Sequence, residues 1–278
     1  MYNFYTNLPQ FIEPVLFSIG PVEVRWYSIM WLVAFFIIYK LSLYRISKNI
    51  KPLLNEYELS DLFFFALLGA IIGGRIGYII FYDFDLFFQN PVSIFLPYDF
   101  QTHSFSGISG MSYHGGLMGV IIATFLYCRK RGLAWFEVIS YLIPAFPLGY
   151  FFGRLGNFLN GELYGRETNS VFGMNFTNDG ILRYPSQLYE AVFEGLVLFL
   201  ILWYLKDTRY KKHLASFYLI GYAFFRFFIE YFRQPDEHLG FVFLNFTMGQ
   251  ILCFVMFVCG IGLYFFENVY WSKFNVKF

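Results

Sequence analysis

Long apolar stretches follow one another along the chain and are separated by short polar segments. A helix needs about 20 residues to cross a hydrocarbon core of roughly 30 Å, and stretches near this length cover residues 26–44, 61–82, 111–128, 134–152, 188–205, 214–232 and 247–266. Glycines and prolines inside them are compatible with membrane helices, because neighbouring helices satisfy the freed backbone groups. The pattern predicts an all-α integral membrane protein, a bundle of about seven transmembrane helices with a small outer polar head region. We expect one polytopic membrane domain over residues 1–278.

Basic residues are unevenly distributed between the connecting segments, and this sets the expected orientation. The segment from Asp83 to Gly110 contains neither Lys nor Arg. Basic residues gather instead in three other loops and near the C-terminus: Arg45, Lys48 and Lys51; Arg129, Lys130 and Arg131; Lys206, Arg209, Lys211 and Lys212; Lys273 and Lys277. Cytoplasmic loops carry the excess of these residues, so we expect the N-terminus outside and the C-terminus inside. No basic residue precedes Arg25, so we expect no cleaved signal peptide at the start.

The composition narrows the class of protein further. Hydrophobic residues make up 58% and charged residues 14% of the chain, whereas soluble domains average roughly 25% charged residues. The formal net charge of +1 offers no basic surface for a polyanion, which excludes nucleic acid as a partner. Cys128, Cys253 and Cys259 lie in apolar segments without metal-ligand spacing, so we expect no metal and no other cofactor.

The basic residues that lie outside these loops and the tail are almost all arginines. Apart from Lys40 near the inner end of the first span, they are Arg25, Arg75, Arg154, Arg166, Arg183, Arg226 and Arg233. The planar guanidinium binds phosphate or carboxylate through two parallel hydrogen bonds, which a lysine ammonium cannot do. A set made only of arginine therefore indicates an anionic ligand.

Polar side chains inside the predicted spans fall at one common depth. Arg75 lies seven residues before the outer end of the second span at Tyr82, roughly 10 Å below it at 1.5 Å per residue. Helices of opposite direction place their polar residues at the same outer level: Tyr27, His114, Arg154, Asn157, Gln187, Glu190, Glu194, Arg226, Glu230 and Arg233. A charge at the bilayer centre costs about 2.5–3.5 kcal/mol on insertion scales, so such residues indicate a functional site.

Two helix faces carry three of these residues each, at spacings that bring them together. Gln187, Glu190 and Glu194 share a face of the fifth span, and Arg226, Glu230 and Arg233 share a face of the sixth. Each set could be a structural ion-pair ladder between helices. The convergence of several spans at one level favours a functional site instead.

The segment 153–190 is the longest outer polar stretch, and we expect it to form a signature loop between the fourth and fifth spans. Its glycines allow close backbone approach to a ligand, and Arg154, Asn157, Asn160 and Glu162 form a donor-rich cluster within nine residues. The alternative is an exposed glycine-rich loop whose polar residues satisfy its turns.

Two weaker signals lie in and beside the third span. Residues 107–110 read GISG, similar to the serine motif of intramembrane proteases, but the fifth to seventh spans supply no partner histidine. His114 abuts two glycines at an outer helix end. It is either a neutral imidazole that acts as a base or a satisfied helix-terminal residue.

The stretch GRLGNFLNGELYGR at residues 153–166 is specific enough to indicate a family. With it, the chain resembles the prolipoprotein diacylglyceryl transferases over its whole length. The further matching segments are Arg25-Trp26-Tyr27, GGRIGY at 73–78, YHGG at 113–116, YPSQLYE at 184–190, Arg226 through Glu230 to RQPD at 233–236, and TMGQ at 247–250. The resemblance implies a seven-helix enzyme of the bacterial inner membrane whose site faces outward, in agreement with the loop charges.

The resemblance also implies the reaction and the partners. The diacylglyceryl group of phosphatidylglycerol would pass to the lipobox cysteine thiol in the signal peptide of a preprolipoprotein. The transfer would form a thioether and release glycerol 1-phosphate, and membrane lipids would surround the enzyme. Such a reaction needs a proton acceptor for the thiol and fixed cations for the phosphate.

By the same resemblance, Arg154 and Asn157 would hold the head group, with Glu162 and Gly165 shaping the loop. Arg226 would stabilise phosphate charge and Glu230 would position it. Tyr27 and His114 are both candidates for the base, and the choice stays open. The remaining substrate-binding candidates are Arg75, Gln187, Glu190 and Arg233, and Glu194 is a further candidate orienter. The competing function, an anion or lipid transporter, would need polar groups that continue to the cytoplasmic side, where the spans are nearly all apolar.

Overall fold

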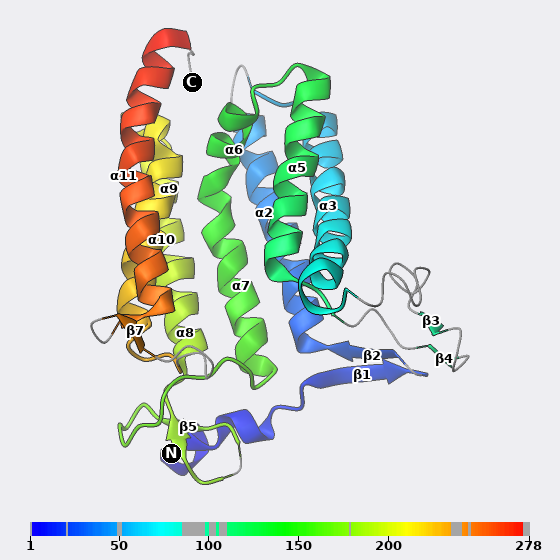
Figure 1. Ribbon diagram of the computed structural model, residues 1–278, viewed down its shortest axis with the longest axis vertical. Coiled ribbons are helices and arrows are strands. Elements are labelled where there is room, and N and C mark those ends of the chain that lie inside the picture. The colour runs from blue at the N-terminus through cyan, green and yellow to red at the C-terminus, as the bar shows by residue number, and fades with distance from the viewer. Residues whose placement is uncertain are drawn as a thin grey trace. The chain divides into compact units, whose positions relative to one another are not determined.

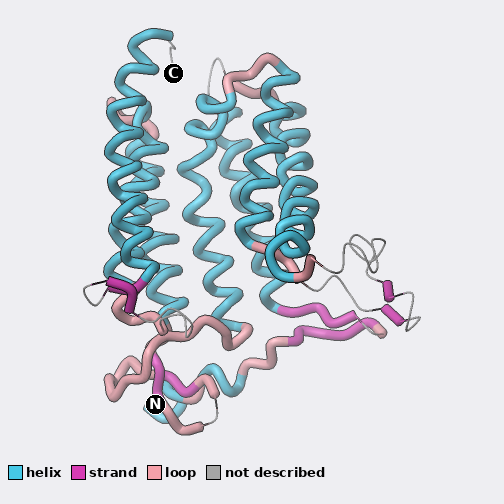
Figure 2. The backbone as a smooth tube through the Cα atoms, in the orientation of Figure 1, coloured by secondary structure: helices cyan, strands magenta, loops and turns pink. Residues whose placement is uncertain are grey.

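The computed structural model describes residues 2–20, 22–48, 52–84, 98–99, 104–105, 110–177, 179–234, 241–243 and 246–274, and helices dominate them (Figures 1 and 2). The chain divides into two compact units. The first comprises Met1–Ile19, Glu23–Ser42 and Ile139–Phe278, and the second comprises Gly20–Val22 and Leu43–Val138. Residues 107–109 of the GISG motif and the end of the RQPD segment lie outside the described residues.

Within the described residues, five helical runs are long and apolar enough to cross a membrane: Trp26–Lys48, Glu56–Tyr82, Trp135–Leu159, Ser186–Leu205 and Met248–Ser272. They match the first, second, fourth, fifth and seventh predicted spans. The third and sixth predicted spans also form helices, α5 (Tyr113–Arg131) and α10 (Leu214–Ile229). These two are not among the five helical runs, and α10 has only 16 residues while α5 ends in three basic residues. The helical membrane fold is confirmed, and the count of seven spans stays a prediction.

The N-terminal part of the first unit leads into its first membrane helix. Helices α1 (Tyr2–Thr6) and η1 (Leu8–Phe11) precede the paired strands β1 (Val15–Ile19) and β2 (Val22–Arg25). Gly20 turns the chain between these strands with a φ of +59°, a conformation that glycine adopts without steric cost. Helix α2 (Trp26–Lys48) begins at the next residue after β2.

The fourth predicted span is interrupted by proline. Helix α6 (Trp135–Leu142) passes through the 3₁₀ turn η3 (Ile143–Ala145) into α7 (Phe146–Leu159). Pro144 and Pro147 lack the backbone N–H that a regular helix needs, which accounts for the change of pitch. Helix α7 continues to Leu159, so the predicted loop 153–190 begins inside a helix.

Glycines lie on the face of α7 that packs against α2. A Cβ atom built on Gly149 would lie 2.3 Å from Ile38 of α2, and one on Gly156 would lie 3.0 Å from Met30. The glycine face of α7 therefore packs closely against side chains of α2, which is the small-residue packing typical of membrane helices.

The fifth predicted span contains an irregular middle section. Helix α8 (Ser186–Glu190) continues through η4, a π-helix (Ala191–Val197), into α9 (Leu198–Leu205). A Cβ on Gly195 would lie 2.7 Å from Phe151, so η4 packs directly against α7. Short π-helical sections occur frequently at functional sites, and this one carries Glu194.

The last two helices complete the first unit. The turn η5 (Lys211–His213) opens α10, and the paired strands β7 (Phe241–Phe243) and β8 (Phe246–Thr247) precede α11 (Met248–Phe274). Helices α10 and α11 pack along their length (Figure 1). The apolar core beside α10 consists of Ile143, Leu198, Leu202, Leu214 and Ala215.

Between α7 and α8 the chain forms a folded loop instead of a free connection. Strands β5 (Met174–Asn175) and β6 (Leu182–Arg183) pair in antiparallel register, with Met174 opposite Arg183. Met174 is almost fully buried, at 2% exposure, so this polar segment has an apolar anchor.

The second unit is built on two long helices. Asn55 caps α3 (Glu56–Tyr82) in a reciprocal capping box with Glu58, and Ser112 caps α5. The two helices touch through glycines: a Cβ on Gly73 would lie 2.4 Å from the backbone oxygen of Gly115, and one on Gly119 would lie 1.9 Å from that of Gly69. The unit also contains the short paired strands β3 (Tyr98–Asp99) and β4 (Ser104–Phe105).

Candidate functional site

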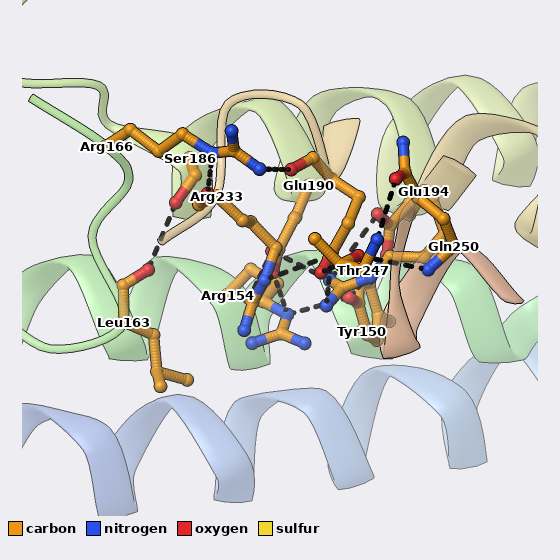
Figure 3. Close-up of polar contacts among 12 residues, drawn as sticks. Tyr150, Arg154, Leu163, Arg166, Ser186, Glu190, Glu194, Arg233, Thr247 and Gln250 are labelled. Carbon is orange, nitrogen blue, oxygen red and sulfur yellow. Dashed lines mark hydrogen bonds and ion pairs between the residues drawn. The ribbon is translucent and has the colours of Figure 1, made fainter. Parts of the chain in front are cut away.

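Glu190 lies at the centre of a buried ion-pair network in the first unit (Figure 3). Its carboxylate is fully buried and contacts three guanidinium groups: Arg154 Nε at 2.6 Å, Arg226 Nη1 at 2.8 Å and Arg233 Nη1 at 2.5 Å. These residues come from α8, α7, α10 and the turn after α10. One carboxylate thus holds together three helices that are far apart in the sequence.

Glu230 forms the second half of the network at the end of α10. Its carboxylate lies 3.3 Å from Arg226 Nη2 and 3.5 Å from Arg233 Nε, as the shared helix face predicts. The hydroxyl of Thr247 donates a hydrogen bond to it at 3.1 Å. A Cβ atom at Gly249 would lie 2.5 Å from Glu230 Oε1, so the first turn of α11 closes tightly over this carboxylate.

Glu194 reaches the network through a tyrosine. Its nearest guanidinium atom, Arg226 Nη1, is 3.9 Å away, but the hydroxyl of Tyr150 donates a hydrogen bond to Glu194 Oε2 at 2.5 Å. The same hydroxyl accepts a hydrogen bond from Arg154 Nε at 2.7 Å. Tyr150 and Thr247 were not among the sequence candidates, although Tyr150 lies four residues before Arg154 on the same helix face.

Three carboxylates therefore face three arginines on helices of the fourth, fifth and sixth predicted spans and at the end of the sixth. Burying an ion pair is costly and is rarely a net source of stability. A charge in the bilayer core is expensive even on insertion scales. The concentration of such groups in one cluster, with the exposed fraction of each arginine side chain at 15–17%, points to an anion-binding role.

The signature residues after α7 form the adjoining wall. Asn157 accepts a hydrogen bond from Arg154 Nη1 at 3.2 Å and donates one to Glu162 Oε1 at 2.9 Å. The amide of Gln187 donates to the backbone oxygen of Glu162 at 2.6 Å. Gln187 therefore supports the loop, and within the described residues no hydrogen bond joins its side chain to Glu190, although the sequence indicates a shared helix face.

Gly165 and Arg166 fix this loop to the end of α10. A Cβ on Gly165 would lie 2.2 Å from the backbone oxygen of Phe232, so only glycine fits there without rearrangement. Arg166 Nε donates to the backbone oxygen of Arg233 at 2.7 Å. The expectation that Gly165 shapes the loop agrees with this geometry, and Arg166 has a backbone-binding role here.

Tyr27 lies beside the signature. Its ring atom Cδ2 lies 3.3 Å from the position that a Cβ of Gly156 would occupy, one residue before Asn157. Its ring also makes an edge contact with Trp31 at a centroid distance of 6.2 Å. The glycine face of α7 therefore lets this phenol approach the helix that carries Arg154.

The second unit holds the two remaining candidates. Arg75 is buried, at 7% exposure, and Nη1 donates to the backbone oxygen of Gly110 at 2.9 Å. His114 lies in the first turn of α5 and lines an apolar groove of about 1370 Å³ along α3 and α5. Asp61 and Arg131, an ion pair at 2.8 Å, line the groove as well.

Within the described part of the chain, no group of three or more His, Cys, Asp or Glu side chains gathers in a geometry that could hold a metal ion. The donor set of the network is guanidinium and carboxylate.

Comparison with known proteins gives one consistent result. The family model described as prolipoprotein diacylglyceryl transferase matches residues 14–266. A phosphatidylglycerol–prolipoprotein diacylglyceryl transferase of Chlorobaculum tepidum is 52% identical over 276 residues, covering 98% of this chain and 93% of the relative. Proteins of the same name from Legionella pneumophila (strain Lens), 44% identical with 94% and 97% covered, and Coxiella burnetii (strain RSA 331), 43% identical with 90% and 93% covered, are also similar. The resemblance drawn from the sequence is confirmed, and this chain belongs to the prolipoprotein diacylglyceryl transferase family, a family of multi-pass membrane enzymes.

Proposed function

We propose that this protein transfers the diacylglyceryl group of phosphatidylglycerol to the lipobox cysteine of a preprolipoprotein signal peptide. In the reaction the cysteine sulfur forms a bond to the terminal glyceryl carbon of the lipid. The bond from that carbon to the phosphate oxygen breaks, and glycerol 1-phosphate leaves with the electron pair. The thiol proton passes to a base. The observation that carries the assignment is the buried network of Arg154, Arg226 and Arg233 around Glu190.

The arginines suit the step in which the phosphate leaves. A phosphate diester carries one negative charge, and the departing phosphate monoester gains a second as the carbon–oxygen bond breaks. Guanidinium groups that are already fixed by Glu190 and Glu230 stabilise this charge without reorganising at the moment of reaction. Arg154 would contact the phosphate, Arg226 would stabilise the charge that the phosphate gains, and Glu230 would hold Arg226 in position.

The thiol needs a proton acceptor, because the thiolate is the reactive nucleophile. Two groups remain candidates: the phenol of Tyr27, which lies beside the signature, and the imidazole of His114, which lines the apolar groove. We assign the base role to this pair without choosing between its members. The groove gives the apolar body of a substrate a place next to His114.

The loop charges support a location in the bacterial inner membrane with the N-terminus outside, the C-terminus in the cytoplasm and the network toward the outer face. The same reasoning disfavours a transporter, since the polar groups of the predicted spans gather at one level. A transporter would move phosphatidylglycerol between leaflets without consuming a thiol.

The decisive experiment incubates the purified protein, reconstituted in vesicles that contain phosphatidylglycerol, with a lipobox peptide. We expect release of glycerol phosphate and a diacylglyceryl mass increase on the peptide cysteine. A peptide with serine in place of cysteine is the matched control and should stay unmodified. Lipid movement between leaflets of a vesicle without any peptide modification would contradict the proposal.

A second experiment separates catalysis by Arg226 from structure. If Arg226 serves the phosphate, Arg226→Ala abolishes transfer and Glu230→Gln, which keeps an acceptor, retains part of it. If the two form only a structural pair, each single change leaves an uncompensated buried charge and chiefly lowers stability. Recovered activity in the double variant with alanine at both positions would contradict a catalytic role for Arg226.

A further inference from the structure

The hydroxyl of Tyr150 lies between the side chains of two charged residues. It donates its single hydrogen to Glu194 Oε2 at 2.5 Å and accepts the Nε–H of Arg154 at 2.7 Å. A phenol has one hydrogen, so its donation to the carboxylate turns the oxygen lone pairs toward Arg154. The direction of both hydrogen bonds is therefore set by the buried charge of Glu194.

These contacts hold the inner edge of the Arg154 guanidinium. Nε is shared between the Tyr150 hydroxyl and Glu190 Oε2, the latter at 2.6 Å, and Nη1 donates to Asn157 at 3.2 Å. No hydrogen bond within the described part of the chain uses Nη2. The outer edge of the fork, Nη1 and Nη2, is the edge that binds a phosphate through two parallel hydrogen bonds.

The ring of Tyr150 is held independently of its hydroxyl. It packs edge-on against Tyr222 at a centroid distance of 5.6 Å, and the Arg154 guanidinium carbon lies 4.8 Å from its ring centroid. A phenylalanine at position 150 would keep both ring contacts and lose only the two hydrogen bonds. The chain thus offers a substitution that isolates the hydroxyl.

We propose that Tyr150 is a positioning residue of the transfer reaction: its hydroxyl, oriented by Glu194, holds Arg154 so that the outer edge of the guanidinium faces the phosphate of the lipid. This inference rests on the proposed function, since it assigns Arg154 to the phosphate. Tyr150 touches neither the lipid nor the thiol. Glu194, which has no arginine nitrogen closer than 3.9 Å, acts through Tyr150 as the orienting charge.

The test compares Tyr150→Phe with Tyr264→Phe, the same chemical change at the other end of the unit, where Tyr264 packs on His213. In Tyr150→Phe we expect kcat to fall about 10- to 100-fold, the range for losing a hydrogen bond to a charged group or misplacing a catalytic group by about 1 Å. KM for phosphatidylglycerol should change far less, because the phosphate gains charge mainly in the transition state. Tyr264→Phe should turn over like the wild type.

A double-mutant cycle then asks whether Tyr150 acts through Arg154. Arg154→Lys removes the fork and keeps the charge, so adding Tyr150→Phe to it should lower kcat by no more than about twofold further. Losses that multiply in the double variant would overturn the proposal. So would a Tyr150→Phe enzyme that melts at a lower temperature but keeps normal kcat per folded molecule, since that is the result of a purely structural role.

A binding measurement separates this inference from the proposed function. Glycerol 1-phosphate should raise the melting temperature of the wild type and of Tyr264→Phe, and raise that of Tyr150→Phe less. If the wild type performs no transfer, the proposed function fails, and this comparison alone tests the positioning of Arg154. Equal shifts in the wild type and Tyr150→Phe, or none in either, would overturn the role of Tyr150.

Discussion

Removing one carboxylate from the network should reveal how unequally the two buried glutamates on the fifth predicted span contribute to stability. Glu190 and Glu194 are both fully buried and one helical turn apart. Glu190 contacts three guanidinium groups at 2.5–2.8 Å. Glu194 has its nearest arginine nitrogen at 3.9 Å and is held chiefly by the hydroxyl of Tyr150. Exchange of either residue for glutamine keeps an oxygen acceptor and removes the charge.

The expected magnitudes follow from these contacts. Glu190→Gln leaves three buried arginines with one negative charge fewer to balance them. Breaking a buried ion pair lowers the free energy of unfolding by about 3–5 kcal/mol. Glu194→Gln preserves the acceptor for Tyr150 and loses one long ion pair, so its cost is about 1–2 kcal/mol. The difference of about 2 kcal/mol corresponds to roughly a 30-fold change in the unfolding equilibrium.

Reversible unfolding in mixed micelles, followed by helical circular dichroism while the denaturing detergent is increased, measures both variants against the wild type. The two substitutions change the same atoms at the same burial, so each is the matched control for the other. Equal free-energy losses, or a larger loss in Glu194→Gln, would refute the assignment of Glu190 as the common counter-ion of the three arginines.

Three further predictions address the base, the orientation and the inner end of the bundle. Tyr27→Phe and His114→Gln each remove one proton acceptor. The base is the residue whose variant loses transfer activity and regains it at high pH, and normal rates in both variants would exclude both residues. A cysteine placed at the exposed position Asn169 should react with an impermeant thiol reagent added outside intact cells, and a cysteine placed at Asp207 should not react. The reverse labelling pattern would contradict the proposed orientation. Burial lowers the pKa of His213 below its ordinary value, and the nearby Lys212 lowers it further. The folded protein therefore binds fewer protons than the unfolded chain and loses stability as pH falls from about 7 through the lowered pKa. A His213→Gln variant should lack this part of the pH dependence of stability, and identical pH profiles in the variant and the wild type would contradict the prediction.

The sequence predicted the helices well because the membrane imposes a length and an apolar composition that can be read directly. Five of the predicted spans agree with helical runs of spanning length. The errors lie at the ends of the spans. Helix α7 extends to Leu159, with glycines of the signature packed against α2, and α10 ends at Ile229, three residues before the predicted end of the sixth span.

The site was predicted in part, for a different physical reason. Helical spacing placed Arg226, Glu230 and Arg233 on one face, and these residues are in contact. Spacing within one helix cannot show which distant helix supplies the partner, so the central position of Glu190 was not predictable. Tyr150 was missed because a tyrosine in an apolar span is ordinarily a packing residue, and only its two hydrogen bonds distinguish it.

The balance of charge in the network bears on how an anionic lipid is recognised. Three arginines face three carboxylates, so the cluster offers a phosphate little surplus positive charge. Recognition must then depend on the orientation of the guanidinium groups. Carboxylates hold one side of each guanidinium in place, and the N–H groups on its other side face the ligand. An arrangement with fewer carboxylates would attract anions more strongly but would leave the arginines to repel one another and reorient in the membrane. We propose that the buried glutamates serve the reaction by fixing the arginines in position, and that the hydroxyl of Tyr150 and the close approach of Gly249 to Glu230 belong to the same functional unit.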